Sequence, residues 1–159
     1  MNALRKMGVL LVLTALSGVG LGNAQSTSRF CNDWLITGAY GFTIEGAKLA
    51  GPGPTGPQVG IALTEFDGRG GLKQVDAVTI GGVEVSDFTH PVATGTYAVN
   101  ADCTGSFTIN FTDGRPSVSA YFVVVDNGSE IDSVVEGVAP GSAGVIATRS
   151  IGKRRFSFF

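Results

Sequence analysis

Short runs of alternating apolar and polar residues, separated by turn residues, fill most of this chain and constrain its fold more than any other feature. An apolar residue at every second position is typical of a β-strand with one buried face. Helix-period apolar patterns are missing beyond the first 24 residues. Tight hairpin turns require residues that accept a positive φ. Such residues lie between the runs, at Asp67-Gly68, Gly81-Gly82 and Asn127-Gly128. The sequence therefore predicts an all-β chain of consecutive hairpins.

The turns divide the chain into eight or nine expected strands. We expect them near residues 39–45, 59–66, 72–80, 83–88, 95–100, 107–111, 118–125, 131–136 and 144–150. Residues 51–57 hold three prolines and three glycines, and we expect a surface loop there, the longest in the domain. Consecutive hairpins favour a small antiparallel up-and-down β-barrel of about eight strands. The alternative is a β-sandwich, which usually needs longer connections between its sheets.

The N-terminal residues predict export. Arg5 and Lys6 precede an apolar run that ends in small residues near Ala24, the order expected of a signal peptide at residues 1–24. The run is too short for a permanent membrane span, which needs about 20 apolar residues. We expect one barrel domain at residues 25–152, a basic and aromatic tail at residues 153–159, and a secreted or periplasmic protein.

The two cysteines indicate a disulfide, and the net charge excludes one class of partner. Cys31 and Cys103 both follow the expected cleavage site, and an even pair in an exported protein usually forms a disulfide. A redox or metal pair needs closer spacing or histidine partners. The formal net charge of −2 argues against a nucleic-acid partner, because phosphate binding needs a basic face.

The expected strand at residues 118–125 carries apolar residues on both faces. An apolar outer face of a barrel needs a cover. We expect either a second copy of the chain, in a homo-oligomer, or the tail at residues 153–159, which ends in Phe158 and Phe159.

No residue pattern predicts catalysis. His90 is the sole histidine, and it lies beside Pro91 at a break between strands, where a solvated loop residue is expected. The turn at residues 67–71 lacks the ligand spacing of a calcium loop and the Lys-Ser/Thr of a phosphate loop. Glu45, Glu65 and Glu136 are expected on the solvated outer face. We therefore assign no catalytic residue, no metal ligand and no cofactor.

Three segments carry a resemblance to a known fold family. Residues 38–43 (GAYGFT), 63–72 (LTEFDGRGGL) and 95–105 (GTYAVNADCTG) resemble a group of secreted, uncharacterised bacterial proteins, which in turn resemble the allene oxide cyclase-like, calycin-type β-barrels. The resemblance spans residues 36–150 and implies a fold. Plant cyclases of that class isomerise an oxylipin epoxide in an apolar cavity, and related barrels carry apolar ligands. None of their working residues aligns with a motif here.

The interior of the barrel decides between the functions that remain. An eight-stranded barrel is wide enough either to be filled by side chains or to hold one small ligand. We expect a filled lower half and a shallow mouth at one end. The first expected function is binding a small apolar molecule, followed by a structural or cell-surface interaction module and then a cofactor-free isomerase or cyclase. The residues expected to line the interior are Tyr40, Phe42, Tyr97, Phe107 and Tyr121.

Overall fold

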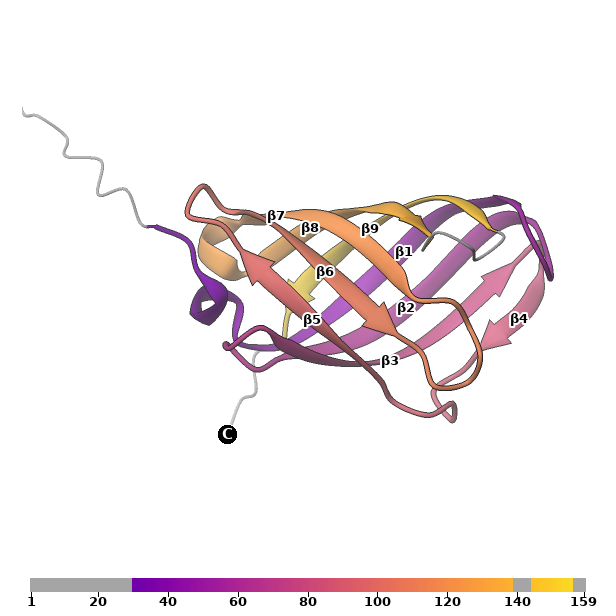
Figure 1. The fold of residues 1–159 in the computed structure, drawn as a ribbon, viewed down its shortest axis with the longest axis horizontal. Coiled ribbons are helices and arrows are strands. Elements are labelled where there is room, and N and C mark those ends of the chain that lie inside the picture. Colours follow the sequence, from indigo (N-terminus) through magenta and orange to yellow (C-terminus); the bar gives the residue numbers. More distant parts are fainter. Residues whose placement is uncertain (1–29, 139–143, 156–159) are drawn as a thin grey trace, which may run out of the picture.

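The computed structural model describes residues 30–138 and 144–155, which form a closed antiparallel β-barrel (Figure 1). The all-β barrel is thereby confirmed over the sandwich. Nine strands and two short 3₁₀-helices occupy these residues. The elements in chain order are η1 (Asp33–Ile36), β1 (Gly38–Ala50), β2 (Gly56–Phe66), β3 (Gly71–Ile80), β4 (Val83–Ser86), β5 (Ala93–Val99), β6 (Thr104–Asn110), β7 (Val118–Val125), η2 (Asp126–Gly128), β8 (Glu130–Val138) and β9 (Val145–Arg154).

Eight of the strands form the wall of the barrel. Each pairs antiparallel with its neighbours in the order β1, β2, β3, β5, β6, β7, β8, β9, and β9 pairs back onto β1. The short β4 lies outside this ring and pairs with β3 alone. Because the ring is closed, each wall strand is paired on both sides over at least part of its length, which limits the edge that another chain could extend.

Glycines stand at positions where the neighbouring strand leaves no room for a side chain. A Cβ atom on Gly95 would lie 2.0 Å from the carbonyl oxygen of Thr108, and one on Gly46 would lie 2.1 Å from that of Ala147. Any larger residue at these positions would have to push the two strands apart. The glycines therefore permit the bending that a small barrel requires.

The residues that point into the barrel are large on β1 and small on β2. On β1 the aromatic residues Tyr40 and Phe42 point inward, with 0% and 6% of their surfaces exposed. On β2 the small Ala62, the cross-strand partner of Phe42, points inward, and the larger Ile61 is 51% exposed on the outside. A large residue beside a small one fills the interior without overpacking it.

Several expected boundaries shift in the structure. β1 runs to Ala50 and β2 begins at Gly56, so the proline-rich loop is shorter than the expected residues 51–57. The expected tail loses Lys153 and Arg154, which belong to β9. The expected signal peptide, Phe158 and Phe159 lie outside the described residues. The prediction that the end of the tail covers β7 therefore stays a prediction.

The helices in the described part of the chain are both single short turns. Neither approaches the length of an apolar helix that could cross a bilayer.

Candidate functional site

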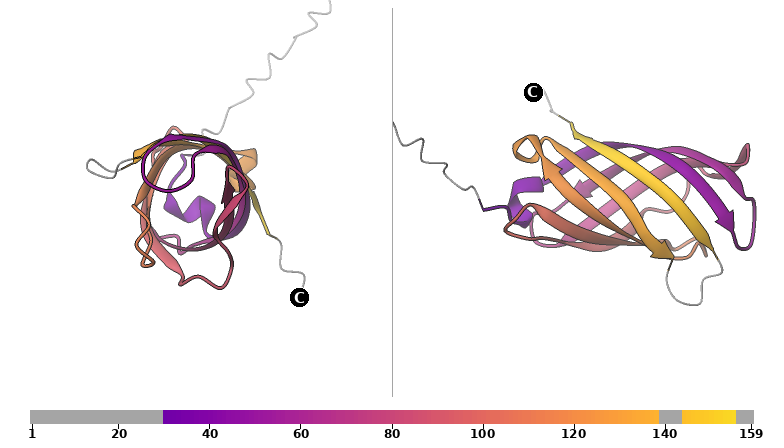
Figure 2. Two further views of the ribbon diagram at one scale, coloured as in Figure 1. Left: turned by 90° about the vertical axis from the view of Figure 1, so that its right-hand side faces the viewer. Right: turned by 90° about the horizontal axis from the view of Figure 1, so that it is seen from above.

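The barrel encloses a cavity of about 800 Å³. Its wall is mainly apolar and includes Phe42, Val78, Phe107 and Ile109. Residues of the β1–β2 loop, of β4 and of the β6–β7 loop also line it, so the cavity reaches the end of the barrel where these segments lie (Figures 1 and 2). The cavity is larger than the expected shallow mouth. Small inward residues on β2 leave the half of the barrel beside the β1–β2 and β6–β7 loops unfilled.

The opposite end is filled by aromatic side chains. The ring of Phe66 packs edge-on against Tyr40, with centroids 5.5 Å apart, and against Tyr97, with centroids 4.9 Å apart. Burial raises the pKa of both tyrosines, and the nearby Arg154 guanidinium offsets part of the rise at Tyr40. This aromatic layer forms the floor of the cavity.

A turn of 3₁₀-helix closes the barrel below that floor. Helix η1 lies across the far end when the barrel is viewed along its axis (Figure 2). Its Ile36 is fully buried, and the side chain of Asn32 caps the helix by accepting a hydrogen bond from the backbone N–H of Leu35. The Asp33 carboxylate accepts a hydrogen bond from the backbone N–H of Val99 at 2.8 Å, which joins the helix to β5.

Arg154 fastens the same closed end from the last strand. Its guanidinium donates to the carbonyl oxygens of Thr37 at 2.8 Å, of Gly128 at 2.9 Å and of Leu35. It also lies over the ring of Tyr40, 5.1 Å from the centroid. One side chain thus ties β9 to both short helices.

The expected disulfide between Cys31 and Cys103 is present. The Cα atoms are 5.0 Å apart, and the bond joins the segment before η1 to the turn between β5 and β6. It therefore holds the closing helix to the barrel wall covalently.

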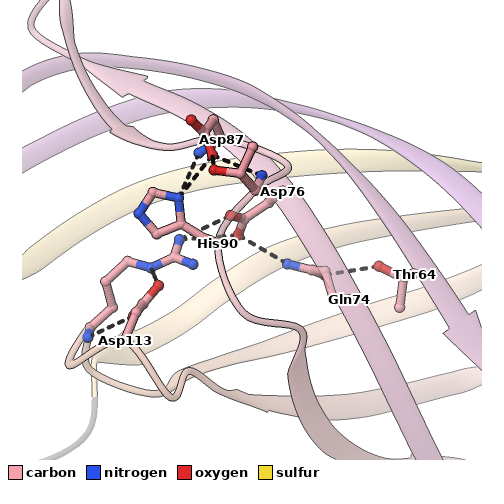
Figure 3. A network of polar contacts seen from close by, with 8 residues as sticks. Thr64, Gln74, Asp76, Asp87, His90 and Asp113 are labelled. Carbon is pink, nitrogen blue, oxygen red and sulfur yellow. Dashed lines mark hydrogen bonds and ion pairs between the residues drawn. The ribbon is translucent and has the colours of Figure 1, made fainter.

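A chain of hydrogen-bonded polar side chains runs along the mainly apolar cavity wall (Figure 3). The Thr64 hydroxyl donates to the Gln74 amide oxygen at 2.8 Å, and the Gln74 amide nitrogen donates to Asp76 at 3.3 Å. Arg115, from the β6–β7 loop, then donates to the two carboxylate oxygens of Asp76 at 3.0 and 3.2 Å. All three residues on β2 and β3 are buried, with Asp76 only 5% exposed.

Arg115 has a second acidic partner within its own loop. Its Nε donates to Asp113 at 2.8 Å, and its guanidinium lies 3.9 Å from the centroid of the Phe111 ring. Burial acts to raise the pKa of Asp113, but hydrogen bonds from Arg115 outweigh it and hold this pKa below its ordinary value. The ion pair with Asp76 holds the β6–β7 loop against β3 at the mouth.

A further polar pair faces the cavity from the other side of the wall. The hydroxyls of Ser133 on β8 and Ser150 on β9 are 2.6 Å apart, and both residues line the cavity. Polar side chains therefore line the mainly apolar cavity on two sides.

The structure separates the five aromatic residues that the sequence places inside. Phe42 and Phe107 line the cavity, whereas Tyr40 and Tyr97 lie in its floor. Tyr121 does not face the interior: it is 54% exposed on the outer surface and donates to Glu136 at 2.7 Å. The prediction that Tyr121 lines the interior is therefore wrong. On β7 the inward positions belong to Ala120 and Phe122, which leaves Tyr121 on the outside.

His90 lies in the loop between β4 and β5, as the sequence indicates. Its Nδ1 is 3.1 Å from a carboxylate oxygen of Asp87. Hydrogen bonds from Thr89 and His90 lower the pKa of Asp87 to about 2. Among the described residues, no three acidic, histidine or cysteine side chains gather into a metal site.

Sequence reasoning missed Gln74, Asp76 and Arg115. A signal for the first two exists in β3, where Gln74 and Asp76 share the inward phase with the apolar Leu72 and Val78. A polar residue in the apolar phase of a strand needs a buried partner. Arg115 carries no such signal, because it lies in a turn and pairs with a residue 39 positions away.

Comparisons with protein-family models, curated proteins and solved structures yield no match for this chain. The function must therefore be argued from the cavity itself.

Proposed function

We propose that this protein binds a small, mainly apolar molecule inside its barrel. The observation that carries the proposal is the cavity of about 800 Å³, which is apolar, open at one end and closed at the other by the aromatic floor and η1. Ligand sites in proteins commonly measure 300–1,000 Å³ and combine apolar walls with a few polar groups. The lumen has this composition.

The construction of the closed end supports binding over a purely structural role. A barrel of this size can fill its interior with side chains. Here the aromatic end is filled and fastened by Arg154, while Phe107, Ile109 and Val78 line the part of the interior that side chains leave unfilled. Apolar surface of the cavity wall that a ligand covers stabilises the complex by about 25 cal/mol per Å².

A pair of variants tests the proposal. Val78→Trp places a large ring in the lumen, beside Gly60 on the neighbouring strand, whereas Ala77→Trp places the same ring on the outer face. We expect a neutral fluorescent probe, N-phenyl-1-naphthylamine, to bind the wild type and the Ala77→Trp variant and to bind Val78→Trp at least ~10-fold more weakly. Equal binding by all three folded proteins contradicts the proposal.

Native mass spectrometry of the protein from its own host addresses the bound molecule directly. A co-purifying apolar compound that is recovered unchanged supports a carrier. A compound that is converted on incubation supports the isomerase or cyclase function that the sequence resemblance implies.

We also propose that the protein works outside the cytoplasm, secreted or periplasmic. The disulfide between Cys31 and Cys103 supports this location, since such bonds persist in oxidising compartments. The charged and apolar N-terminal segment supports it independently. N-terminal sequencing of the exported protein tests the proposal, with the first residue expected near Gln25.

A second candidate function uses the outer surface. Tyr121 and Val134 pair across β7 and β8 and are 54% and 53% exposed, and Val123 beside them is 43% exposed. Adjacent exposed apolar side chains are typical of an interaction surface. We propose a second copy of the chain as the partner there. Light scattering of wild type and a Tyr121→Ser, Val134→Thr variant tests this: equal monomeric masses contradict it.

A further inference from the structure

We propose that the ligand in the lumen carries a hydrogen-bond donor at its polar end, such as a hydroxyl group, and is not an acid. This inference rests on the proposed binding function and concerns the polar chain that runs along the cavity wall. Asp76 is the acceptor that receives the donor.

The charges around Arg115 exclude a carboxylate from that position. Its single positive charge already faces two carboxylates, Asp76 at 3.0 Å and Asp113 at 2.8 Å. A ligand carboxylate bound to the same guanidinium would bring a third negative charge into a partly dehydrated site. Like charges at such distances repel strongly where water is scarce.

Of the described residues that line the cavity, Lys48 is the one cation besides Arg115, and it is hydrogen-bonded at the mouth. Lys48 lies near the end of β1, and its Nζ donates to the carbonyl oxygen of Pro52 in the β1–β2 loop. Its charge therefore lies at the rim, whereas Gln74 and Asp76 lie on the inner face of β3. An acid could approach the rim, but among the described residues that line the cavity it would find no uncompensated cation beside Asp76.

The hydrogen-bonding capacity of the polar chain favours a hydroxyl. A carboxylate has about four acceptor positions, and Asp76 uses three of them, two for Arg115 and one for Gln74. The Gln74 amide nitrogen has two N–H groups and donates one of them to Asp76. A hydroxyl group can donate to the remaining Asp76 position and accept from the second N–H of Gln74.

The test compares three straight-chain probes of ten or eleven carbons on the wild-type protein by displacement of N-phenyl-1-naphthylamine at pH 7. We expect 1-decanol to bind at least ~10-fold more tightly than decanoate, and also more tightly than 1-methoxydecane, which has no donor. Decanoate binding as tightly as decanol overturns the inference and leaves the proposed function standing. If no probe displaces the dye and the dye itself does not bind, the proposed function fails instead.

A matched pair of variants tests whether Asp76 causes the preference for decanol over decanoate. In Asp76→Asn the acceptor loses its charge and Arg115 is left with one carboxylate, so the preference for decanol over decanoate should fall by at least ~10-fold. Glu45→Gln removes a carboxylate from an arginine pair on the outer face and should leave the preference unchanged. An unchanged preference in a folded Asp76→Asn protein contradicts the role of Asp76. Should that variant not fold, the wild-type comparison still decides.

Discussion

Arg154 and Tyr40 donate hydrogen bonds to the same acceptor, the carbonyl oxygen of Gly128. The three residues come from β9, β1 and η2, so one carbonyl oxygen links these three elements at the closed end of the barrel. Arg154 extends the contact to η1 through the carbonyl oxygens of Leu35 and Thr37. The floor of the cavity is therefore held by one cation and a set of backbone carbonyls.

Arg154→Met should destabilise the fold by about 2–4 kcal/mol, because it leaves carbonyl groups in the closed end without their donor. Urea denaturation measures the change. Lys153→Met is the matched control: Lys153 is the preceding residue of β9, its side chain is 76% exposed, and its loss should cost under about 0.5 kcal/mol. Similar losses in both variants would contradict the role of Arg154.

Removing the disulfide should lower the free energy of unfolding by about 2–4 kcal/mol, since it closes a long loop in the unfolded chain. A Cys31→Ser, Cys103→Ser double variant measures this by urea denaturation. Because the bond holds η1 to the wall, amide hydrogen exchange should also accelerate at Leu35 and Thr37 relative to the amides of β3. Uniform acceleration would show that the bond does not act on the closed end.

All three tyrosines should ionise above the ordinary pKa of about 10. Burial raises the pKa of Tyr40 and Tyr97, and the hydrogen bond to Glu136 raises that of Tyr121. The neutral form is favoured in the folded state, so the stability from these groups is complete below pH 10 and is lost as the pH rises through the folded values. Ultraviolet titration measures the ionisation. A tyrosine that titrates normally in Tyr121→Phe would contradict the buried floor.

Asp87 should titrate near pH 2, because Thr89 and His90 hydrogen-bond to its carboxylate. A lowered pKa means that the carboxylate form is favoured in the folded state. Its contribution to stability is therefore present above about pH 4 and is lost as the pH falls through about 2. Carbon-detected NMR of the Asp87 side chain checks this value. In Thr89→Val the pKa should move back toward the ordinary range.

The hairpin order of the barrel follows from local chemistry, and the sequence predicts it well. Turn residues mark the strand ends: Asp67 accepts hydrogen bonds from the backbone N–H groups of Arg69 and Gly71, and Gly81 and Gly82 both have a positive φ. These interactions span at most four residues, so a sequence pattern contains them. The pairing of Cys31 with Cys103 was predictable for another reason, namely that they are the two cysteines of the chain.

The strand faces are less predictable because a barrel buries only one of them. Along β2 the larger Val59 and Ile61 are outside and the smaller Ala62 and Thr64 are inside, which reverses the arrangement of β1. The reversal depends on the partner strand, since Phe42 already fills the space opposite Ala62. Single-strand patterns do not contain that information.

The candidate site depends on contacts between distant segments. Arg115 reaches Asp76 from another strand connection, and Arg154 reaches η1 across more than a hundred residues. Before the fold is known, Arg154 reads as part of a basic tail. Only its position in register with Tyr40 on β1 places its side chain inside the barrel end.

The location of a bound ligand tests the central claim most directly. Isotope-filtered NMR of the labelled protein with unlabelled 1-decanol reports which side chains lie within about 5 Å of the ligand. We predict nuclear Overhauser effects to Val78, Phe107 and Ile109, which line the lumen. Contacts confined to Tyr121, Val123 and Val134 on the outer face, or no contacts at all, would contradict a ligand-binding barrel.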